Sequence, residues 1–449
     1  MRRLIGLGLL AVSMLATNAC RSTDAAAKSL LPCEIALADH DGNSKLDEEI
    51  RSAQKKIRSR QNTDQVLPEI EKLGWHYVEK ARASFDPGYY KLAEQCAACL
   101  EAKLAQPVKA ETAAQTFAPL SPKAAKASAL LLRGHVLHSL HRFAEAETIA
   151  RELATSRGLA FDFGLLGDVL MEQGKLDESI AAYQKMMDLK PSPQAYSRAA
   201  HVRWLQGDLD GARVLMRMSA QGANAGDAEA SAWAWSKLAL YELQAGALKQ
   251  AVASCELALE LQPGYAPALL AQGRVLLAEN KFNEAVPLLE RAARQNPLPE
   301  YRWTLADALR AAGRNDEAQK VEAELNSHGA GDDPRSFAVY LATRGEQLLT
   351  ALKLAENELK NRRDVFTLDA LAWAQSAAGN HDQAWQTMQQ TMQQALATGT
   401  KDARLFLHAA VIAAKSNQPT EARQFAKRAS AIQSTLLPSE RNQLAQLKL

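Results

Sequence analysis

Residues 235–263 read WSKLALYELQAGALKQAVASCELALELQP, and this stretch decides the fold. Each of its halves repeats apolar residues at three- and four-residue steps, which is typical of a helix with one buried face. Gly246 lies between the halves, where a chain that reverses direction needs a residue that tolerates the left-handed conformation. Pro263 follows the second half, and proline cannot continue a helix without losing a hydrogen bond. The stretch therefore predicts two antiparallel helices joined by a tight turn.

The same arrangement recurs along most of the chain at steps of 33 to 39 residues. A small residue stands in each second helix, at Ala146, Ser179, Ala212, Ala251, Ala285, Ala318, Ala351, Ala384 and Ala422. Twelve residues earlier, eight of nine residues are Gly or Ala, in the series Gly134, Gly167, Ala200, Ala239, Gly273, Ala306, Val339, Ala372 and Ala410. Gly or Asn marks the turns, at Gly174, Gly207, Gly246, Asn280, Gly313, Gly379 and Asn417. We expect the first two series to lie where two helices cross closely, because only Gly or Ala leaves room for both backbones.

These three series resemble the tetratricopeptide repeat. Nine units cover residues 127–430, of which the unit over 327–364 is degenerate, and a weaker tenth unit covers 67–104. The resemblance implies an all-α solenoid, a right-handed superhelix of about ten helical hairpins, in which neighbours stack because one hairpin cannot bury its apolar face alone. We expect a leader over 1–19, an N-terminal module over 20–66, a degenerate first repeat and linker over 67–126, the repeat array over 127–430 and a capping helix over 431–449. The extra residues at 221–227 and 397–400, and the stretch His328–Asp333, are predicted as loops.

The first twenty residues are typical of an exported protein. Two arginines precede the apolar stretch Leu4–Leu15, which is too short to span a bilayer as a helix. We expect cleavage after Ala19, which leaves Cys20 at the mature N-terminus. This resembles a bacterial lipoprotein leader, in which the cysteine is diacylated, although Thr17 stands where such leaders usually carry Leu. The expected location is the periplasm, with a lipid anchor in the outer membrane; soluble periplasmic export is the alternative.

The composition favours helices and excludes one class of partner. Of 449 residues 47% are hydrophobic and only 6% are aromatic, a mixture that suits packed helices better than sheets. The formal charge is +2, from 53 basic and 51 acidic residues, and loss of Arg2 and Arg3 with the leader leaves 51 against 51. A neutral chain without a basic stripe does not indicate nucleic-acid binding.

The family resemblance implies a ligand on the concave face, which one side of each first helix forms. Projecting that side onto this chain predicts the following binding residues: His135, His138, Asp168, Met171, His201, Trp204, Trp233, Arg274, Trp303, Asp307, Arg310, Phe366, Asp369 and Trp373. Aromatic and charged side chains together suit a protein or peptide partner. The alternative is that the tryptophans are packing residues. The Lys and Asn pattern that binds chaperone C-terminal peptides is absent from these positions.

Residues 39–50 resemble an EF-hand calcium loop. The predicted ligands are Asp39, Asp41, Asn43, the Lys45 carbonyl, Asp47 and Glu49. Ser44 stands where the loop needs Gly, and Ile50 stands where it needs the closing Glu. The alternative is a plain acidic loop. Calcium is the only cofactor that the sequence suggests.

Other candidate sites are weaker. His135, His138 and His141 do not share one helix face, so we expect no metal there. Cys96 and Cys99 form a C-x-x-C motif inside a predicted helix, where packing or a structural disulfide is expected, and Cys33 and Cys255 are the other candidates for a disulfide in an oxidising compartment. We therefore predict a binding protein and no enzyme. The alternatives are a catalytic site between repeats, with His201 beside Asp168, and calcium-responsive binding.

Overall fold

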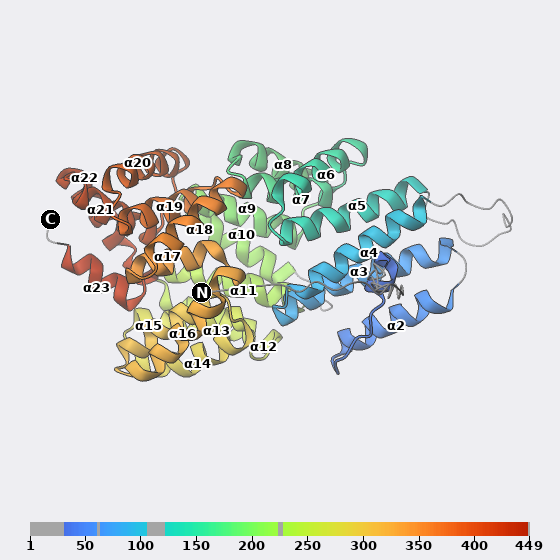
Figure 1. Ribbon diagram of the computed structural model, residues 1–449, viewed down its shortest axis with the longest axis horizontal. Coiled ribbons are helices and arrows are strands. Elements are labelled where there is room, and N and C mark those ends of the chain that lie inside the picture. The colour runs from blue at the N-terminus through green and yellow to red at the C-terminus, as the bar shows by residue number, and fades with distance from the viewer. Residues whose placement is uncertain (1–30, 61–62, 106–121, 223–227, 448–449) are drawn as a thin grey trace, which may run out of the picture.

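The computed structural model describes residues 31–60, 63–105, 122–222 and 228–447. Within these ranges it contains 23 α-helices, one 3-10 helix and no strand. The predicted leader with Cys20 and the stretch 223–227 lie outside the described residues. Two short elements come first, α1 (Pro32–Ala36) and α2 (Lys45–Ser59). The predicted all-α solenoid is confirmed (Figure 1).

Ten helical hairpins follow in chain order. They are α3 (Thr63–Ser84) with α4 (Gly88–Leu104), α5 (Pro122–Ser139) with α6 (Phe143–Ser156), α7 (Ala160–Glu172) with α8 (Leu176–Leu189), α9 (Pro193–Leu205) with α10 (Leu209–Gly222), α11 (Ala228–Gln244) with α12 (Leu248–Leu261), α13 (Ala266–Ala278) with α14 (Phe282–Gln295), α15 (Pro299–Ala311) with α16 (Asn315–Asp332), α17 (Pro334–Arg344) with α18 (Leu348–Asn361), α19 (Val365–Ala377) with α20 (His381–Thr398), and α21 (Ala403–Lys415) with α22 (Pro419–Ala431). The chain ends in η1 (Gln433–Thr435) and α23 (Pro438–Gln446).

The repeated small residues lie where the two helices of each hairpin cross. All nine residues of the series from Ala146 to Ala422 are fully buried, at 0% exposure. A Cβ added to Gly167 would lie 2.3 Å from a ring carbon of Tyr183, and one added to Gly273 would lie 2.5 Å from Leu289 Cδ2. The turn series from Gly174 to Asn417 has φ between 57° and 86° throughout. Close helix crossing and left-handed turns are therefore both confirmed.

The stretch His328–Asp333 is helical up to Asp332, so its prediction as a loop is wrong. Gly329 is buried against Phe337 of the next helix, whose ring would lie 2.5 Å from an added Cβ. This packing favours an extra helical turn over a solvent-exposed loop. At the other irregular step α20 likewise extends to Thr398, and Gly399, with a φ of 95°, ends it.

The N-terminal module is continuous with the solenoid. A disulfide joins Cys33, in α1, to Cys99, in α4, while Cys96 and Cys255 are buried free thiols. Tyr77 of α3 is fully buried and donates from its hydroxyl to the carbonyl of Ala36 at 2.9 Å. One apolar cluster extends from α1 through α5. The first hairpin is therefore a genuine unit of the stack, fastened to α1 by the disulfide.

The superhelix folds back on itself. In Figure 1 the orange and red helices of the last repeats lie against the green helices of the middle repeats. Two seams carry this contact: the Gly174 turn touches Arg363, whose carbonyl oxygen would lie 2.5 Å from an added Cβ, and the Gly207 turn touches Gly399, whose oxygen would lie 2.3 Å from one. Thr400 Oγ1 adds a hydrogen bond to the Leu205 carbonyl at 2.9 Å. The later repeats therefore contact the earlier repeats directly along these two seams.

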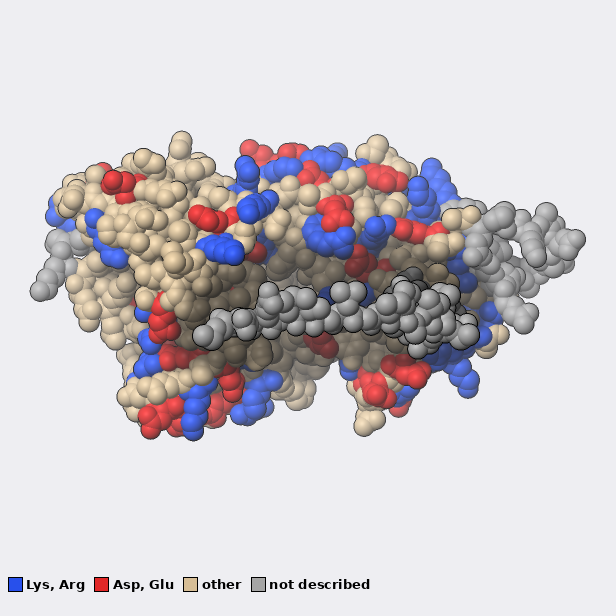
Figure 2. Space-filling view, viewed as in Figure 1, with Lys and Arg blue, Asp and Glu red and all other residues tan. Residues whose placement is uncertain are grey.

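The surface carries charges of both signs. Figure 2 shows Lys and Arg interspersed with Asp and Glu over the face in view. Across the ranges that the structure describes, every helix is too short or too polar to cross a membrane.

Candidate functional site

A cavity of about 710 Å³ lies on the axis of the superhelix. Every first helix from α5 to α21 contributes side chains to its wall, together with η1. Its volume falls within the range of about 300–1,000 Å³ that is common for ligand pockets. The repeats bring these side chains together because each first helix presents one side inward.

Ten of the fourteen predicted binding residues line this cavity. They are His138, Asp168, Met171, His201, Trp204, Trp233, Arg274, Trp303, Phe366 and Asp369. The projection along the first helices therefore coincides with most of the cavity wall, and binding by these residues stays a prediction.

The other four predicted residues lie between elements and away from the cavity wall. His135 packs against Trp75, with ring centres 5.5 Å apart, and burial lowers its pKa to about 3. Asp307 accepts a hydrogen bond from the backbone N–H of Ser439, and the Arg310 guanidinium pairs with Glu322. Trp373 is 4% exposed and stacks on His408 with ring centres 4.1 Å apart. These four side chains do not line the cavity, because His135 and Trp373 pack against neighbouring first helices, Asp307 against the C-terminal segment and Arg310 against α16 of its own hairpin.

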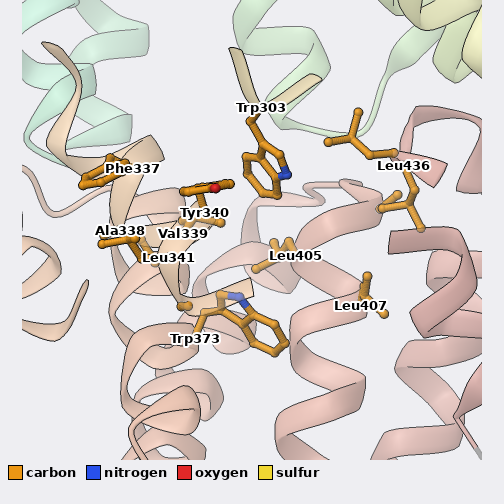
Figure 3. Close-up of a cluster of buried hydrophobic side chains, with 14 of the residues drawn as sticks. Trp303, Phe337, Ala338, Val339, Tyr340, Leu341, Trp373, Leu405, Leu407 and Leu436 are labelled. Carbon is orange, nitrogen blue, oxygen red and sulfur yellow. The ribbon is translucent and has the colours of Figure 1, made fainter. Parts of the chain in front are cut away.

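Trp303 lines the cavity but is also a core residue. It is 4% exposed, and Figure 3 shows it converging with Tyr340, Trp373 and Leu436 from separate elements. The guanidinium carbon of Arg404 lies 4.5 Å from the centre of its ring. Trp303 therefore packs in the core as well as lining the cavity.

A stack of aromatic rings crosses the cavity. The Trp204 ring centre lies 5.5 Å from His201, 6.2 Å from Tyr241 and 5.8 Å from Phe366, with near-parallel planes. Trp204 Nε1 donates to Gln244 Oε1 at 2.7 Å. Since Trp204 belongs to α9 and Phe366 to α19, the stack joins the two halves of the superhelix. Offset ring pairs of this kind stabilise by about 0.5–1.5 kcal/mol beyond their burial.

Ion pairs occupy much of the remaining wall. Arg198 Nε donates to Asp168 Oδ1 at 2.7 Å, and Tyr183 donates from its hydroxyl to the same oxygen at 2.8 Å. Burial raises the pKa of Asp168, but the Arg198 guanidinium outweighs it and holds the pKa below its usual range. Sequence reasoning missed Arg198, which lies one helical turn before His201 and so shares its face. Extending the projection by one turn would have found it.

His201 and Asp168 do not form an acid–base pair. Burial and the nearby Lys237 lower the pKa of His201 to about 4, so the imidazole is neutral at pH 7. Asp168 is already engaged by Arg198. General acid–base catalysis needs a group whose pKa lies near the working pH. This pair does not meet that requirement.

The EF-hand-like loop does not gather its predicted ligands. Asp47 Oδ1 lies 2.6 Å from Lys80 Nζ and 2.8 Å from His40 Nε2. Asp47 Oδ2 accepts a hydrogen bond from the backbone N–H of Ser44, the N-cap of α2. Burial raises the pKa of Asp47, but Lys80 with Ser44 and His40 holds it well below its usual range.

The other predicted ligands stand apart from Asp47. The Asp39 side chain is fully exposed beside Arg58, Asp41 and Asn43 are exposed, and Lys45 already begins α2. Glu49 lies beside His76, with 3.8 Å between Oε2 and Nδ1. Among the described residues no group of three or more His, Cys, Asp or Glu could hold a metal ion. Calcium binding by this loop stays a prediction, to be tested by titration.

Comparison with known proteins identifies the repeats. A family model described as tetratricopeptide repeat matches residues 165–228 and 270–332, and a second model of that description matches 366–390. The chain therefore carries tetratricopeptide repeats, which generally serve as non-enzymatic scaffolds that bind proteins. No curated protein matches the chain. A chain of the structure described as "Crystal structure of APC/C hetero-tetramer Cut9-Hcn1" is similar over 90% of this chain and 96% of its own, at 12% identity and a TM-score of 0.32. At that similarity nothing about function is inferred from it.

Proposed function

We propose that this protein is an interaction scaffold of the bacterial cell envelope, which holds a segment of a partner protein at the central cavity. The observation that carries the proposal is the wall of that cavity, to which the first helix of nine consecutive hairpins contributes. Tyr241, Trp233 and Trp204 supply aromatic contact area there, and aromatic side chains are common anchors of protein interfaces. A non-enzymatic role fits the neutral His201 and the paired Asp168.

Two features support a place in the envelope. The first is the export leader with Cys20, on which the lipid anchor is proposed. The second is the disulfide between Cys33 and Cys99, because disulfides persist in oxidising compartments such as the periplasm. Mass spectrometry of the mature protein tests the anchor directly. A diacylated Cys20 at the N-terminus is expected, and an unmodified Cys20 or a later N-terminus contradicts it.

Affinity capture from envelope extract tests the scaffold role. Trp233 and Lys237 are the residues to change, because both belong to α11 and line the cavity. Lys237 Nζ lies 6.0 Å from the Trp233 ring centre. We expect Trp233→Ala to reduce capture of the partner at least tenfold, since interface anchors commonly contribute about 2 kcal/mol or more. Lys237→Ala should have a smaller effect that shrinks in high salt.

Lys185→Ala is the control for this experiment, because Lys185 is exposed on α8 and does not line the cavity. Equal capture by the wild type, both cavity variants and the control would show that the partner does not use the cavity. Circular dichroism of each variant separates lost binding from lost folding.

A further inference from the structure

Residues 433–446, at the C-terminal end of the described chain, do more than cap the final repeat. We call this segment, which comprises η1 and α23, the tail. It packs against α21 and α22, as a cap does, and its buried Leu436 and Leu437 belong to the same apolar cluster as Trp373. It also contacts α11, α13 and α15, more than a hundred residues earlier in the chain. A segment that only capped the final repeat would need the contacts with α21 and α22 but not those with α11, α13 and α15.

Several polar groups of the tail contact these earlier helices, while Glu440 pairs with Arg404 of α21. Ser434 Oγ donates to the Leu243 carbonyl at 3.0 Å, and Arg274 donates to the Thr435 carbonyl at 3.1 Å. Ser439 donates to Asp307 twice, from its backbone N–H at 3.1 Å and from its hydroxyl. Since Asp307 is 6% exposed, this pairing satisfies a buried carboxyl group that would otherwise lack a partner of this strength.

Arg441 reaches the C-terminal end of α13. Its guanidinium donates to the Leu277 carbonyl at 2.7 Å, and lies 3.3 Å from Asn280 Oδ1. Helix C-terminal carbonyls lack partners within their own helix and carry partial negative charge, so a cation there is stabilising. Arg441 is half-buried in this contact, and burial lowers the pKa of its guanidinium.

We propose that this surface, formed by Leu243, Arg274, Leu277, Asn280 and Asp307, is a segment-binding site that the tail occupies in cis. The inference rests on the proposed scaffold function, because a partner segment is what would displace the tail. The segment that fits begins a helix, places a hydroxyl residue of its first turn on Asp307 and places an arginine two residues later on the end of α13. Thr435 also lines the central cavity, so release of the tail opens one part of the cavity wall.

The tail itself, as a peptide, is the probe that tests the site. A labelled peptide of residues 431–447 is titrated against full-length protein in three forms: wild type, the double variant Ser439→Ala with Arg441→Ala, and the control Asn442→Ala. Asn442 is exposed on the same helix. We expect the peptide to bind the double variant at least tenfold more tightly than the wild type and the control, because the cis segment competes less. A peptide with the same two substitutions should bind none of them.

Equal peptide binding by the wild type and the double variant would overturn the proposal. Should the double variant fail to fold, hydrogen exchange on the wild type decides instead: saturating peptide should accelerate exchange in 433–446, and unchanged exchange overturns the inference. The scaffold function is judged separately. If a partner is captured equally well by the wild type and the double variant, the tail site alone is refuted. If the peptide binds as expected but no partner is captured, the scaffold function alone is refuted.

Discussion

The turn glycines of the early repeats and those of the later repeats share one backbone conformation and differ in their surroundings. Gly174 and Gly207 have φ of 74° and 71°, and Gly246 and Gly313 have φ of 72° and 79°. A Cβ on either of the first two would collide with the backbone of a later repeat, whereas one on Gly246 or Gly313 would meet no atom within 4 Å among the described residues. The left-handed backbone therefore favours glycine in all four turns, and the seams leave no room for a Cβ in two of them.

Gly207→Ala should have the largest effect. The substitution adds left-handed strain of about 1–2 kcal/mol to a collision that typically destabilises by about 1–3 kcal/mol. We expect the free energy of unfolding to fall by about 2–5 kcal/mol and the radius of gyration to rise as the Gly399 seam opens. Denaturant unfolding and small-angle X-ray scattering measure the two quantities.

Gly313→Ala is the matched control, because its φ is similar and its surroundings are open. It should lower the free energy of unfolding only by the strain of about 1–2 kcal/mol and leave the radius of gyration unchanged. Identical losses for the two variants would mean that the seam between Gly207 and Gly399 is not closed in solution.

The pH dependence of stability tests whether the tail is docked on Asp307. Burial, with a contribution from Glu440, raises the pKa of Asp307 to about 6, while Ser439 and Arg404 oppose the shift. A carboxyl group whose pKa is raised by folding stabilises the fold fully below its unfolded pKa, near 3.9, and this stabilisation is lost as pH rises through about 6. Between pH 4 and pH 7 we expect the wild type to lose up to about 3 kcal/mol relative to Asp307→Asn.

Guanidinium denaturation of both proteins across that pH range measures the difference. The neighbouring charges Glu440, Arg404 and Arg441 are present in both, so their titration cancels to first order. A difference that is flat with pH would mean that the Asp307 carboxyl group is solvated and that the tail is detached.

Thr400→Val removes one hydrogen bond from the seam between the Gly207 turn and Gly399. Thr400 is 2% exposed and donates to the Leu205 carbonyl, nearly two hundred residues away in sequence. Removal of the hydroxyl leaves that carbonyl with one partner fewer and should destabilise by about 1 kcal/mol. Thr398→Val is the comparison, because its hydroxyl bonds within its own helix, to Gln394. A smaller loss for Thr400→Val than for Thr398→Val would contradict closure.

Lys401→Ala should have the smallest effect. Its ammonium donates to the Gly207 carbonyl at 3.2 Å, but the side chain is exposed, so solvent competes for the contact. We expect a change within about 0.5 kcal/mol, similar to that for Lys185→Ala on α8. A loss of more than about 1 kcal/mol in the free energy of unfolding would indicate that solvent reaches this contact less than the structure shows.

The candidate site was predictable to the extent that it depends on one helix at a time. His201 and Trp233 follow from the inward side of their own helices, and both line the cavity. Asp307 and Trp373 have the same helical register but do not line the cavity, because Ser439 and His408 contact them from other elements. Register tells which way a side chain points, but not what fills the space in front of it.

The sequence by itself determined the repeat, its crossing points and its turns. Each is a local steric requirement: Ala251 and Gly273 leave room for an adjacent backbone, and Gly246 tolerates a positive φ. Only the tertiary structure decided that the superhelix closes, that Phe366 stacks on Trp204 and that the tail lies on Asp307. The reason is geometric, because small rotations between successive hairpins accumulate along the stack. Where the later repeats meet the earlier ones is therefore a property of the whole array, which no single repeat encodes.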